Sequence, residues 1–255
     1  MKTDLGLAGA VVLVTGGVRG VGRGISDVFL AYGAHVVACA RHDTPIDAEF
    51  ARCDVRDEAQ VAALIDGIVD RHGRLDVVVN NAGGAPYAPA ADASPRLHEK
   101  IVQLNLLAPL LVAQRANAVM QRQDGGGSIV MISSVSGTRA SPGTAAYGAA
   151  KAGLDNLTAS LAVEWAPKVR VNALDVGMVR TEQAHLHYGS EAAIEAVGKT
   201  VPLGRLAEPA EVGACAAFLA SPLASYVSGA TLRVHGGGEV PAFLAAADVN
   251  HREDS

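Results

Sequence analysis

Short apolar runs alternate along the chain with longer segments in which apolar residues recur three and four positions apart. The runs are rich in Val, Ile, Leu and Ala, as in residues 11–14, which is typical of central parallel strands buried on both faces. The longer segments are typical of helices that cover a sheet, and residues 61–69 show the clearest stripe. This alternation, without repeats or linkers, predicts an α/β protein whose parallel sheet has helices on both faces.

A single domain is expected over residues 1–247. Within it, the polar and weakly patterned segment 178–200 is expected to form a lid over a substrate, and the charged tail 248–255 is expected to fray. The expected strands are residues 11–14, 34–40, 50–55, 75–79, 128–133, 169–174 and 231–234.

A long helical pattern over residues 97–120 contains Asn105, with Pro109 four positions later. Proline has no N–H, so the Asn105 carbonyl cannot receive its usual helical hydrogen bond. A buried carbonyl without a partner binds water, which is one interpretation of this pair. The other interpretation is a simple kink that curves a long helix.

A glycine-rich turn, TGGVRGVG at residues 15–22, follows the first expected strand and leads into a helical pattern. In that context glycines let the backbone approach a pyrophosphate, which the amides at the helix N-terminus then bind. The spacing differs from the commoner dinucleotide fingerprint, and glycines needed only for turning and packing are the alternative. The candidate cofactor residues in this turn are Gly16, Arg19, Gly20, Val21 and Gly22.

The ends of the second and third expected strands bear on which dinucleotide binds. An acidic residue after the second strand would accept from the ribose hydroxyls of NAD, but Arg41 stands there instead. A guanidinium suits the 2′-phosphate of NADP, and Arg19 is placed to flank it. NADP(H) is therefore favoured over NAD(H), with a solvated loop arginine as the alternative. After the third strand come Asp54 and Val55, where Asp54 either accepts from the adenine amino group or caps the next helix.

Residues 134–151, SVSGTRASPGTAAYGAAK, carry the candidate chemistry. Tyr147 and Lys151 are four apart, so on a helix they share one face. Ser134 ends the fifth expected strand and is expected to point at the same place. A phenol beside an ammonium is a candidate proton donor, and the charge of Lys151 is expected to lower its pKa. A core aromatic beside a surface lysine is the alternative for this pair taken alone.

Composition and charge narrow the range of partners. The net charge is −5 with Lys and Arg scattered, which indicates neither a nucleic-acid groove nor a basic membrane patch. No apolar segment reaches the length of a membrane helix. The three cysteines are far apart in or beside apolar segments, as in reducing compartments, so a cytoplasmic location is expected. His185 and His187 are two apart, a poor spacing for a shared metal, so no metal is expected.

Together these features resemble the short-chain dehydrogenase/reductase family over residues 7–238. The resemblance rests on Thr15-Gly16-x-x-x-Gly20-x-Gly22, Asn80-Asn81-Ala82-Gly83, Asn105, Ser134 and Tyr147-x-x-x-Lys151, in the family's order and spacing. It implies a Rossmann-type, doubly wound sheet of about seven strands and hydride transfer between a nicotinamide cofactor and a secondary alcohol or ketone. It assigns catalysis to Asn105, Ser134, Tyr147 and Lys151. To the cofactor residues it adds Asn81, Ala82, Gly83, Gly177, Val179 and Thr181, together with Tyr147 and Lys151.

The resemblance also implies a homotetramer, assembled through the last helix and strand and through the helix of Tyr147. The residues expected to line the pocket are mostly Ala, Pro, Met and Leu, which favours an apolar substrate of acyl, alicyclic or steroid-like type. Two departures are present: Val176 where the family commonly has Pro, and His235 where it commonly has Asp. A catalytically silent, cofactor-sensing protein on the same fold is the alternative function.

Overall fold

Seven parallel strands form one sheet in the order β3-β2-β1-β4-β5-β6-β7 in the computed structural model, which describes residues 4–246. The order reverses between β1 and β4, as in doubly wound Rossmann-type sheets, so the predicted fold class is confirmed. The strands are β1 (Val11–Thr15), β2 (His35–Ala40), β3 (Glu49–Arg52), β4 (Val77–Asn80), β5 (Gly127–Ser134), β6 (Val169–Val176) and β7 (Thr231–Val234).

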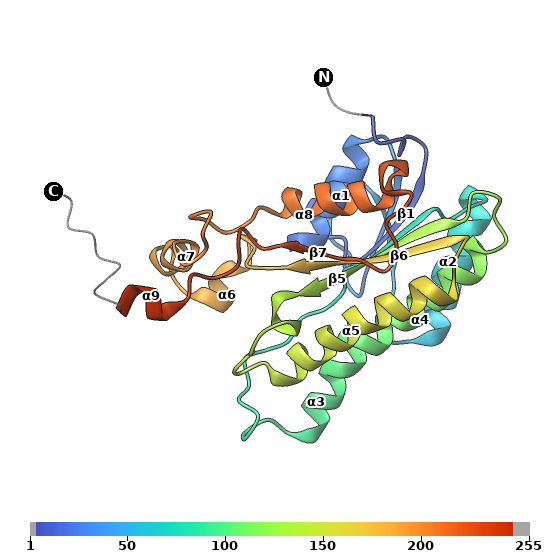
Figure 1. Cartoon of the computed structure of the whole chain (residues 1–255). Helices are drawn as coiled ribbons and strands as arrows, with labels where there is room; N and C mark the ends of the chain where they lie inside the picture. Colours follow the sequence, from blue (N-terminus) through green and yellow to red (C-terminus); the bar gives the residue numbers. More distant parts are fainter. Residues whose placement is uncertain (1–3, 247–255) are drawn as a thin grey trace.

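Helices cover both faces of the sheet (Figure 1). Leu13 of β1 packs into the core on one face, whereas Val12 and Val14 pack into the core on the other, and all three are fully buried. This explains why the strand is apolar at every position. One face carries α1 (Gly20–Ala31) and α8 (Pro209–Ala220), and the other carries α2 (Glu58–His72), α4 (Ala108–Met120) and α5 (Ala145–Glu164).

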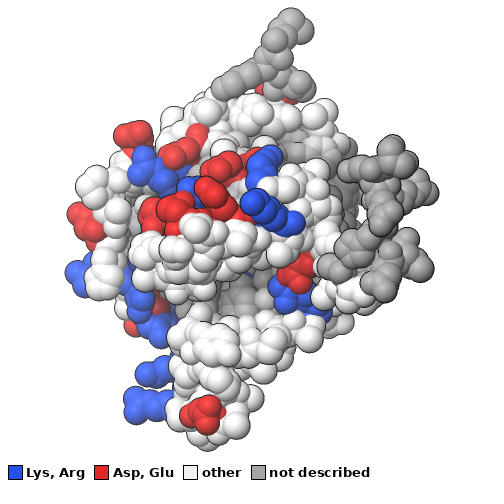
Figure 2. All heavy atoms as spheres, turned by 90° about the vertical axis from the view of Figure 1, so that its left-hand side faces the viewer, with Lys and Arg blue, Asp and Glu red and all other residues white. Residues whose placement is uncertain are grey.

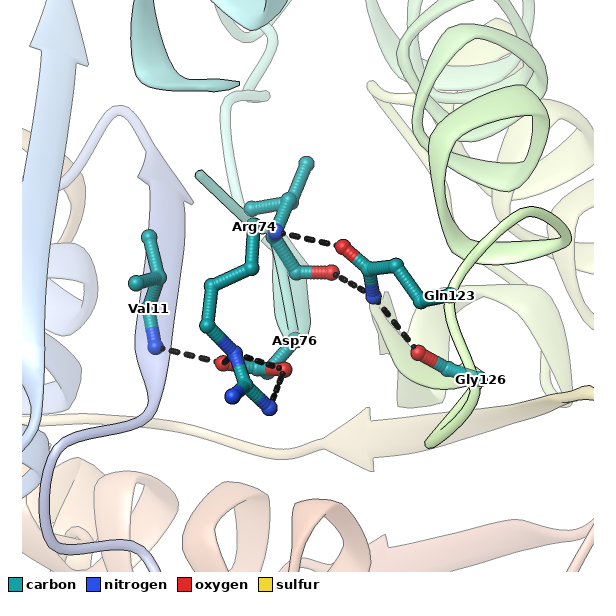
Figure 3. Close-up of polar contacts among 6 residues, drawn as sticks. Val11, Arg74, Asp76, Gln123 and Gly126 are labelled. Carbon is teal, nitrogen blue, oxygen red and sulfur yellow. Dashed lines mark hydrogen bonds and ion pairs between the residues drawn. The ribbon is translucent and has the colours of Figure 1, made fainter. Parts of the chain in front are cut away.

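The amino edge of the sheet is closed by side chains bonded to the backbone (Figure 3). Asp76 Oδ2 accepts the Val11 N–H at 2.8 Å and thereby ties β4 to β1. Gln123 accepts the Leu75 N–H at 2.8 Å and donates to the Gly126 carbonyl at 2.8 Å. The backbone groups at this amino edge therefore already have hydrogen-bond partners within the protein. The candidate site lies at the opposite, carboxyl edge of the sheet.

The predicted long helix over residues 97–120 is three segments in the structure. They are α3 (Pro95–Val102), the π-helix η1 (Gln103–Leu107) and α4. At the junction the Ala108 N–H donates to the Gln103 carbonyl, five residues back. Pro109 then lies in the first turn of α4, where the missing N–H costs least. The irregularity is therefore a π-helix centred on Asn105, and not the simple kink that was one of the two interpretations of the sequence.

The segment 178–200 contains two short helices, α6 (Ala184–Tyr188) and α7 (Glu191–Gly198), at the carboxyl edge. Ala184 and Ile194 pack with Leu206 in a small core of their own. Other short elements are the 3₁₀ helices η2 (Val135–Gly137) and η3 (Pro222–Ala224), and α9 (Ala242–Ala246), which was not predicted. The tail expected to fray lies outside the described residues. Across residues 4–246, every helix is too short or too polar to cross a membrane.

Candidate functional site

The glycine turn after β1 and the turn after β4 are hydrogen-bonded to each other. Thr15 Oγ1 accepts the N–H groups of Asn81 and Ala82, each at 3.0 Å. The Asn81 side chain donates back to the carbonyls of Thr15 at 3.0 Å and Gly16 at 3.2 Å. A side chain at Gly22 would collide with the Gly16 carbonyl, so this position requires glycine. The two turns form one wall at the strand-order reversal, where doubly wound sheets bind ligands.

The first turn of α1 binds a carboxylate from the segment 178–200. Gly20 N–H donates to Glu182 Oε1 at 3.0 Å. Arg19 immediately precedes this turn and lines the same cleft of about 500 Å³, and Val21 packs against the core behind it. Free amides at a helix N-terminus bind phosphate oxygens as they bind carboxylate oxygens. The turn therefore fits the pyrophosphate of a dinucleotide.

The side chains after β2 and β3 are those that the sequence predicts to bind the adenosine end of the cofactor. Asp54 already has a partner, because Arg56 Nη2 lies 2.6 Å from its Oδ2. This hydrogen bond, with a smaller contribution from Arg41, holds the pKa of Asp54 below its usual range. Arg41 itself is exposed after β2, and Val55 is buried. The structure thus places a cation at the end of β2, beside a carboxylate that is engaged elsewhere.

Ser134 and Tyr147 meet at the carboxyl end of β5. Ser134 is the last residue of that strand, and Tyr147 lies in the first turn of α5. The Ser134 hydroxyl accepts the Ser136 N–H at 3.2 Å and is hydrogen-bonded to the Tyr147 phenol. Burial raises the pKa of Tyr147, and the Ser134 hydrogen bond opposes that rise. Gly137, at the end of η2, lets this turn pack closely against α5, since a Cβ at Gly137 would be only 2.7 Å from the Ala152 nitrogen.

Lys151 lies one turn after Tyr147 and is only 3% exposed. Its ammonium donates to the Ile132 carbonyl at 2.7 Å and is 5.5 Å from the centre of the Tyr147 ring. Burial lowers the pKa of Lys151 to about 8, and Asp155 opposes this. The prediction that Lys151 lowers the pKa of Tyr147 was wrong for the protein alone. Burial outweighs any effect of the lysine, whose ammonium is bonded to a carbonyl.

Asn105 is fully buried in η1, and its side chain is bonded to the turn after β4. Oδ1 accepts the Gly84 N–H at 2.8 Å, and Nδ2 donates to the Gly84 carbonyl at 2.9 Å. Gly83 lies between Asn105 and Lys151: a Cβ there would be 2.7 Å from Asn105 Oδ1 and 3.5 Å from Lys151 Nζ. The structure therefore brings these residues together, and only glycine fits between them.

The turn after β6 carries the chain from the sheet to the lid. Gly177 packs tightly on His235, since a Cβ at Gly177 would lie 2.8 Å from the His235 Cβ. Val179 forms an isolated bridge with the segment before α8. Thr181 approaches the glycine turn, with its Cγ2 3.5 Å from where a Cβ of Gly20 would be. Gly177, Val179 and Thr181 thus lead from the sheet edge to the anion-binding turn.

Two contributors to this site were not predicted as site residues. Thr15 could have been found from the sequence, because it directly precedes Gly16 at the end of an apolar run. Glu182 could not have been found in this way, because the residue it contacts, Gly20, is 162 positions away in the sequence. Within residues 4–246, no group of three or more His, Cys, Asp or Glu side chains is placed to hold a metal ion.

A doubly wound sheet, an anion-binding glycine turn and, beside it, Ser134 and Tyr147 with the buried Lys151 define a dinucleotide-dependent oxidoreductase. A family model described as "Enoyl-(Acyl carrier protein) reductase" matches residues 16–239. The chain belongs to the short-chain dehydrogenase/reductase family, whose members use a nicotinamide cofactor, and it is a dehydrogenase or reductase.

Relatives within the family match almost the whole chain. An L-fucose dehydrogenase of Oryctolagus cuniculus is 38% identical over 254 residues, covering 94% of this chain and 88% of the relative. A D-threitol dehydrogenase of Mycolicibacterium smegmatis is 35% identical, with coverages of 92% and 94%. The ligand-free structure of Thermoplasma acidophilum aldohexose dehydrogenase is 34% identical with a TM-score of 0.88, covering 92% of this chain and 96% of that one.

Proposed function

We propose that this protein transfers a hydride between NADP(H) and the hydroxyl-bearing carbon of a polyhydroxylated alcohol or sugar. The observation that carries the reaction type is the ammonium of buried Lys151 5.5 Å from the centre of the Tyr147 ring, at the end of the strand that carries Ser134. A cofactor-sensing protein would need the glycine turn but not these three groups. The sensor is therefore the alternative that an activity test has to eliminate.

In the proposed reaction the nicotinamide accepts or supplies the hydride, and side chains of this protein manage the proton. Tyr147 gives its proton to a carbonyl oxygen in reduction and removes one from the hydroxyl in oxidation. Ser134 holds and polarises the substrate oxygen, because a hydroxyl both donates and accepts. Lys151 binds the nicotinamide ribose, and an ammonium turned towards the phenol favours the tyrosinate.

Asn105 is assigned to proton supply. Its side chain is fixed by the two bonds to Gly84, and only Gly83 separates it from the ammonium of Lys151. Its backbone carbonyl lies in the π-helix, where the regular hydrogen-bond ladder is interrupted. We expect this carbonyl to hold a water that links Lys151 to solvent.

Replacing Tyr147 by Phe tests the reaction type. Tyr147→Phe removes only the hydroxyl, so turnover should fall by about 10² to 10⁴-fold while NADPH affinity stays nearly unchanged. Steady-state rates at 340 nm and a fluorescence titration with NADPH measure the two effects. Tyr32→Phe, directly after α1 at the opposite edge of the sheet, is the matched control. A Tyr147→Phe protein that retains more than a few per cent of activity would exclude the assignment.

The preference for NADP(H) is supported by the exposed Arg41 after β2 and by Arg19 at the glycine turn. The carboxylate of Asp54, after β3, is hydrogen-bonded to Arg56. The proposed cofactor contacts are Gly16, Arg19, Gly20, Val21, Gly22, Arg41, Asp54, Val55, Asn81, Ala82, Gly83, Tyr147, Lys151, Gly177, Val179 and Thr181.

Reversing the charge at Arg41 tests this preference. Arg41→Asp should lower the ratio of NADPH to NADH affinity by about tenfold or more, since a 2′-phosphate loses its cation and meets an anion. Arg122→Asp makes the same change on an exposed residue near the opposite edge of the sheet and should leave the ratio unchanged. An unaltered ratio in Arg41→Asp would mean that the phosphate is bound elsewhere or that NAD is the cofactor.

The polar residues near the lid support a hydroxylated substrate. Arg139, in the loop after η2, pairs with Glu239, its Nη2 lying 2.6 Å from Oε1. Tyr188 of α6 is close to both, since Arg139 lowers and Glu239 raises its pKa while burial raises it further. Such groups bind sugar hydroxyls well. An apolar ketone or alcohol, expected from the sequence, remains the second candidate, favoured by the exposed Leu186 on the lid.

A panel at 340 nm with both cofactors separates these possibilities. L-fucose, D-threitol and aldohexoses represent hydroxylated substrates, and cyclohexanol, cyclohexanone and acyl ketones represent apolar ones. Turnover confined to the first group supports the proposal, and turnover confined to the second replaces it with the apolar class. Silence throughout, together with tight NADPH binding, would favour the sensor.

We also propose a cytoplasmic homotetramer. Large apolar residues are exposed on the elements that the family resemblance assigns to assembly, namely Val163 of α5, Phe218 of α8 and Leu232 of β7, and the exposed Tyr226 lies just before β7. The cysteines, all three of which lie in the described part of the chain, are free, as in a reducing compartment.

A further inference from the structure

Tyr87, in the loop between β4 and α3, is held on one side and open to solvent on the other. Its ring lies so close to the backbone of Gly143 that no side chain would fit at that glycine, whose φ of 76° also favours glycine. The next residue, Ala88, donates its N–H to the Gly143 carbonyl at 2.7 Å. Nevertheless, 77% of Tyr87 is exposed. A ring fixed in this way loses little conformational freedom when a ligand packs on it.

The loop that carries Tyr87 runs from the turn after β4 to the start of α5. At its beginning, the backbone of Gly84 is bonded to the Asn105 side chain at 2.8 and 2.9 Å. Further along, it lies beside the loop before α5 (Figure 1), and Gly143 there is four positions before Tyr147. The exposed ring therefore lies at the start of the helix that carries the proposed proton donor, at the carboxyl edge of the sheet.

The loop against which Tyr87 packs also carries a charged group. Arg139, four positions before Gly143, pairs with Glu239 at 2.6 Å, and each of these two side chains is 42% exposed. An aromatic face and an accessible ion pair thus meet on one short segment, residues 139–143. The aromatic face suits an apolar ligand surface, and the ion pair suits hydroxyl groups.

A closed sugar ring has both kinds of surface. Its C–H bonds form an apolar face that stacks on an aromatic ring, and its hydroxyls form a polar rim that hydrogen-bonds to charged side chains. An open-chain polyol has the hydroxyls but no flat apolar face. A fixed aromatic ring therefore favours the cyclic form over the open chain.

We propose that Tyr87 is a specificity-determining residue on which the apolar face of a closed sugar ring stacks. The inference rests on the proposed function and names the substrate class within it, cyclic sugars in preference to open-chain polyols. Tyr87 takes no part in hydride or proton transfer. Its contact is the same in the bound substrate and in the transition state, so it affects KM and leaves kcat nearly unchanged.

Kinetics with one cyclic and one open-chain substrate test the proposal. Tyr87→Ala should raise KM for L-fucose by about five- to tenfold, because the stacked face is lost, and should leave kcat within about twofold. KM for D-threitol should change by less than about twofold. An equal rise in both KM values, or no rise in either, overturns the proposal.

Two further substitutions separate stacking from other roles of the side chain. Tyr87→Phe keeps the flat ring and loses only the hydroxyl, so KM for L-fucose should stay close to that of the wild type. Tyr87→Leu keeps an apolar side chain without a flat face and should behave like Tyr87→Ala. A Phe variant as impaired as the Ala variant would assign the effect to the hydroxyl and overturn stacking.

A binding measurement decides the inference without turnover. Saturation-transfer difference NMR uses methyl L-fucopyranoside, whose ring cannot open, with the oxidised cofactor present. The sugar C–H protons should receive saturation from the wild type and from Tyr87→Phe, and the signal should be lost in Tyr87→Ala. No signal in the wild type, or an equal signal in Tyr87→Ala, overturns the proposal. A silent substrate panel together with the expected NMR result would reject the proposed function and leave the stacking site standing.

Discussion

Single residues in this site are held in states that cost stability. Lys151 keeps an ammonium within a core position, where burial lowers its pKa to about 8. One bond to the Ile132 carbonyl offsets only part of the cost of removing a charge from water. A buried charge that lowers the stability of the folded protein is typical of functional sites.

We expect the wild type to gain stability between pH 8 and pH 10.5 relative to Lys151→Met. The pKa of Lys151 is about 8 in the folded protein against an ordinary 10.5, so in this interval the unfolded chain binds more protons and the free energy of unfolding rises with pH. The relative gain should be about 3 kcal/mol. Urea unfolding of both proteins at pH 7.5 and pH 10 measures it, with Lys100→Met on the surface of α3 as control. A difference between wild type and Lys151→Met that does not change with pH would contradict this expectation.

The sequence predicted that Ser134, Tyr147 and Lys151 would lie close together. It did not predict the direction in which the pKa of Tyr147 is shifted. Tyr147 and Lys151 are one helical turn apart, and Ser134 ends a strand beside them, so spacing alone placed them together. The direction of the Tyr147 pKa depends on burial and on where the Lys151 ammonium points, which no local pattern records.

Elements were predicted well where both faces are buried and less well at the edges. Strand β1 was expected over residues 11–14 and spans Val11–Thr15, because each of its residues is buried. Strand β3 was expected over residues 50–55 and spans Glu49–Arg52, because it is an edge strand with exposed ends that carry a weaker pattern. The π-helix could not be read from the sequence, since the Asn105 side chain that accompanies it bonds to Gly84, 21 residues away.

The segment 178–200, proposed as a lid, contacts the glycine turn at which the cofactor is proposed to bind. Figure 2 views the molecule from the side that carries the lid in Figure 1, and acidic and basic side chains gather there. Glu182 and Glu191 line one cleft with Arg180, and Glu182 also reaches the glycine turn. Its carboxylate bonds the amide that a pyrophosphate would use, so the lid and a dinucleotide compete for one donor.

Glu182→Gln should therefore tighten NADPH binding by about three- to tenfold. The amide oxygen still accepts from Gly20, but the repulsion between a carboxylate and the phosphates is gone. Fluorescence titration at low and high salt measures the gain, which should shrink as salt screens the charge. Glu191→Gln is the control, because that carboxylate is paired with Arg180 at 2.7 Å and does not touch the glycine turn. Weaker binding in Glu182→Gln would instead mean that Glu182 helps to hold the cofactor.

At the scale of the whole molecule, the strand order followed from the family resemblance and not from the hydrophobic pattern. Alternating strands and helices predicted a parallel sheet, but the pattern does not state that β1 pairs with both β2 and β4. That pairing creates the reversal at which the glycine turn and the turn after β4 meet. The site is therefore a consequence of topology, although each of its motifs is local.

The proposed tetramer can be tested at two exposed apolar residues. Val163 on α5 is 81% exposed, and Tyr226 between η3 and β7 is fully exposed. A closed tetramer with dihedral symmetry uses at least two different interfaces, so losing one leaves dimers and losing both leaves monomers.

Val163→Asp and Tyr226→Glu should each give dimers, and the double variant should give monomers, in sedimentation velocity runs in which the wild type has the mass of four chains. Tyr87→Glu, an exposed aromatic in the loop before α3, should remain tetrameric. A wild type that sediments as a monomer would leave these apolar residues without the proposed role. Single variants that both remain tetrameric would place the interfaces on other surfaces.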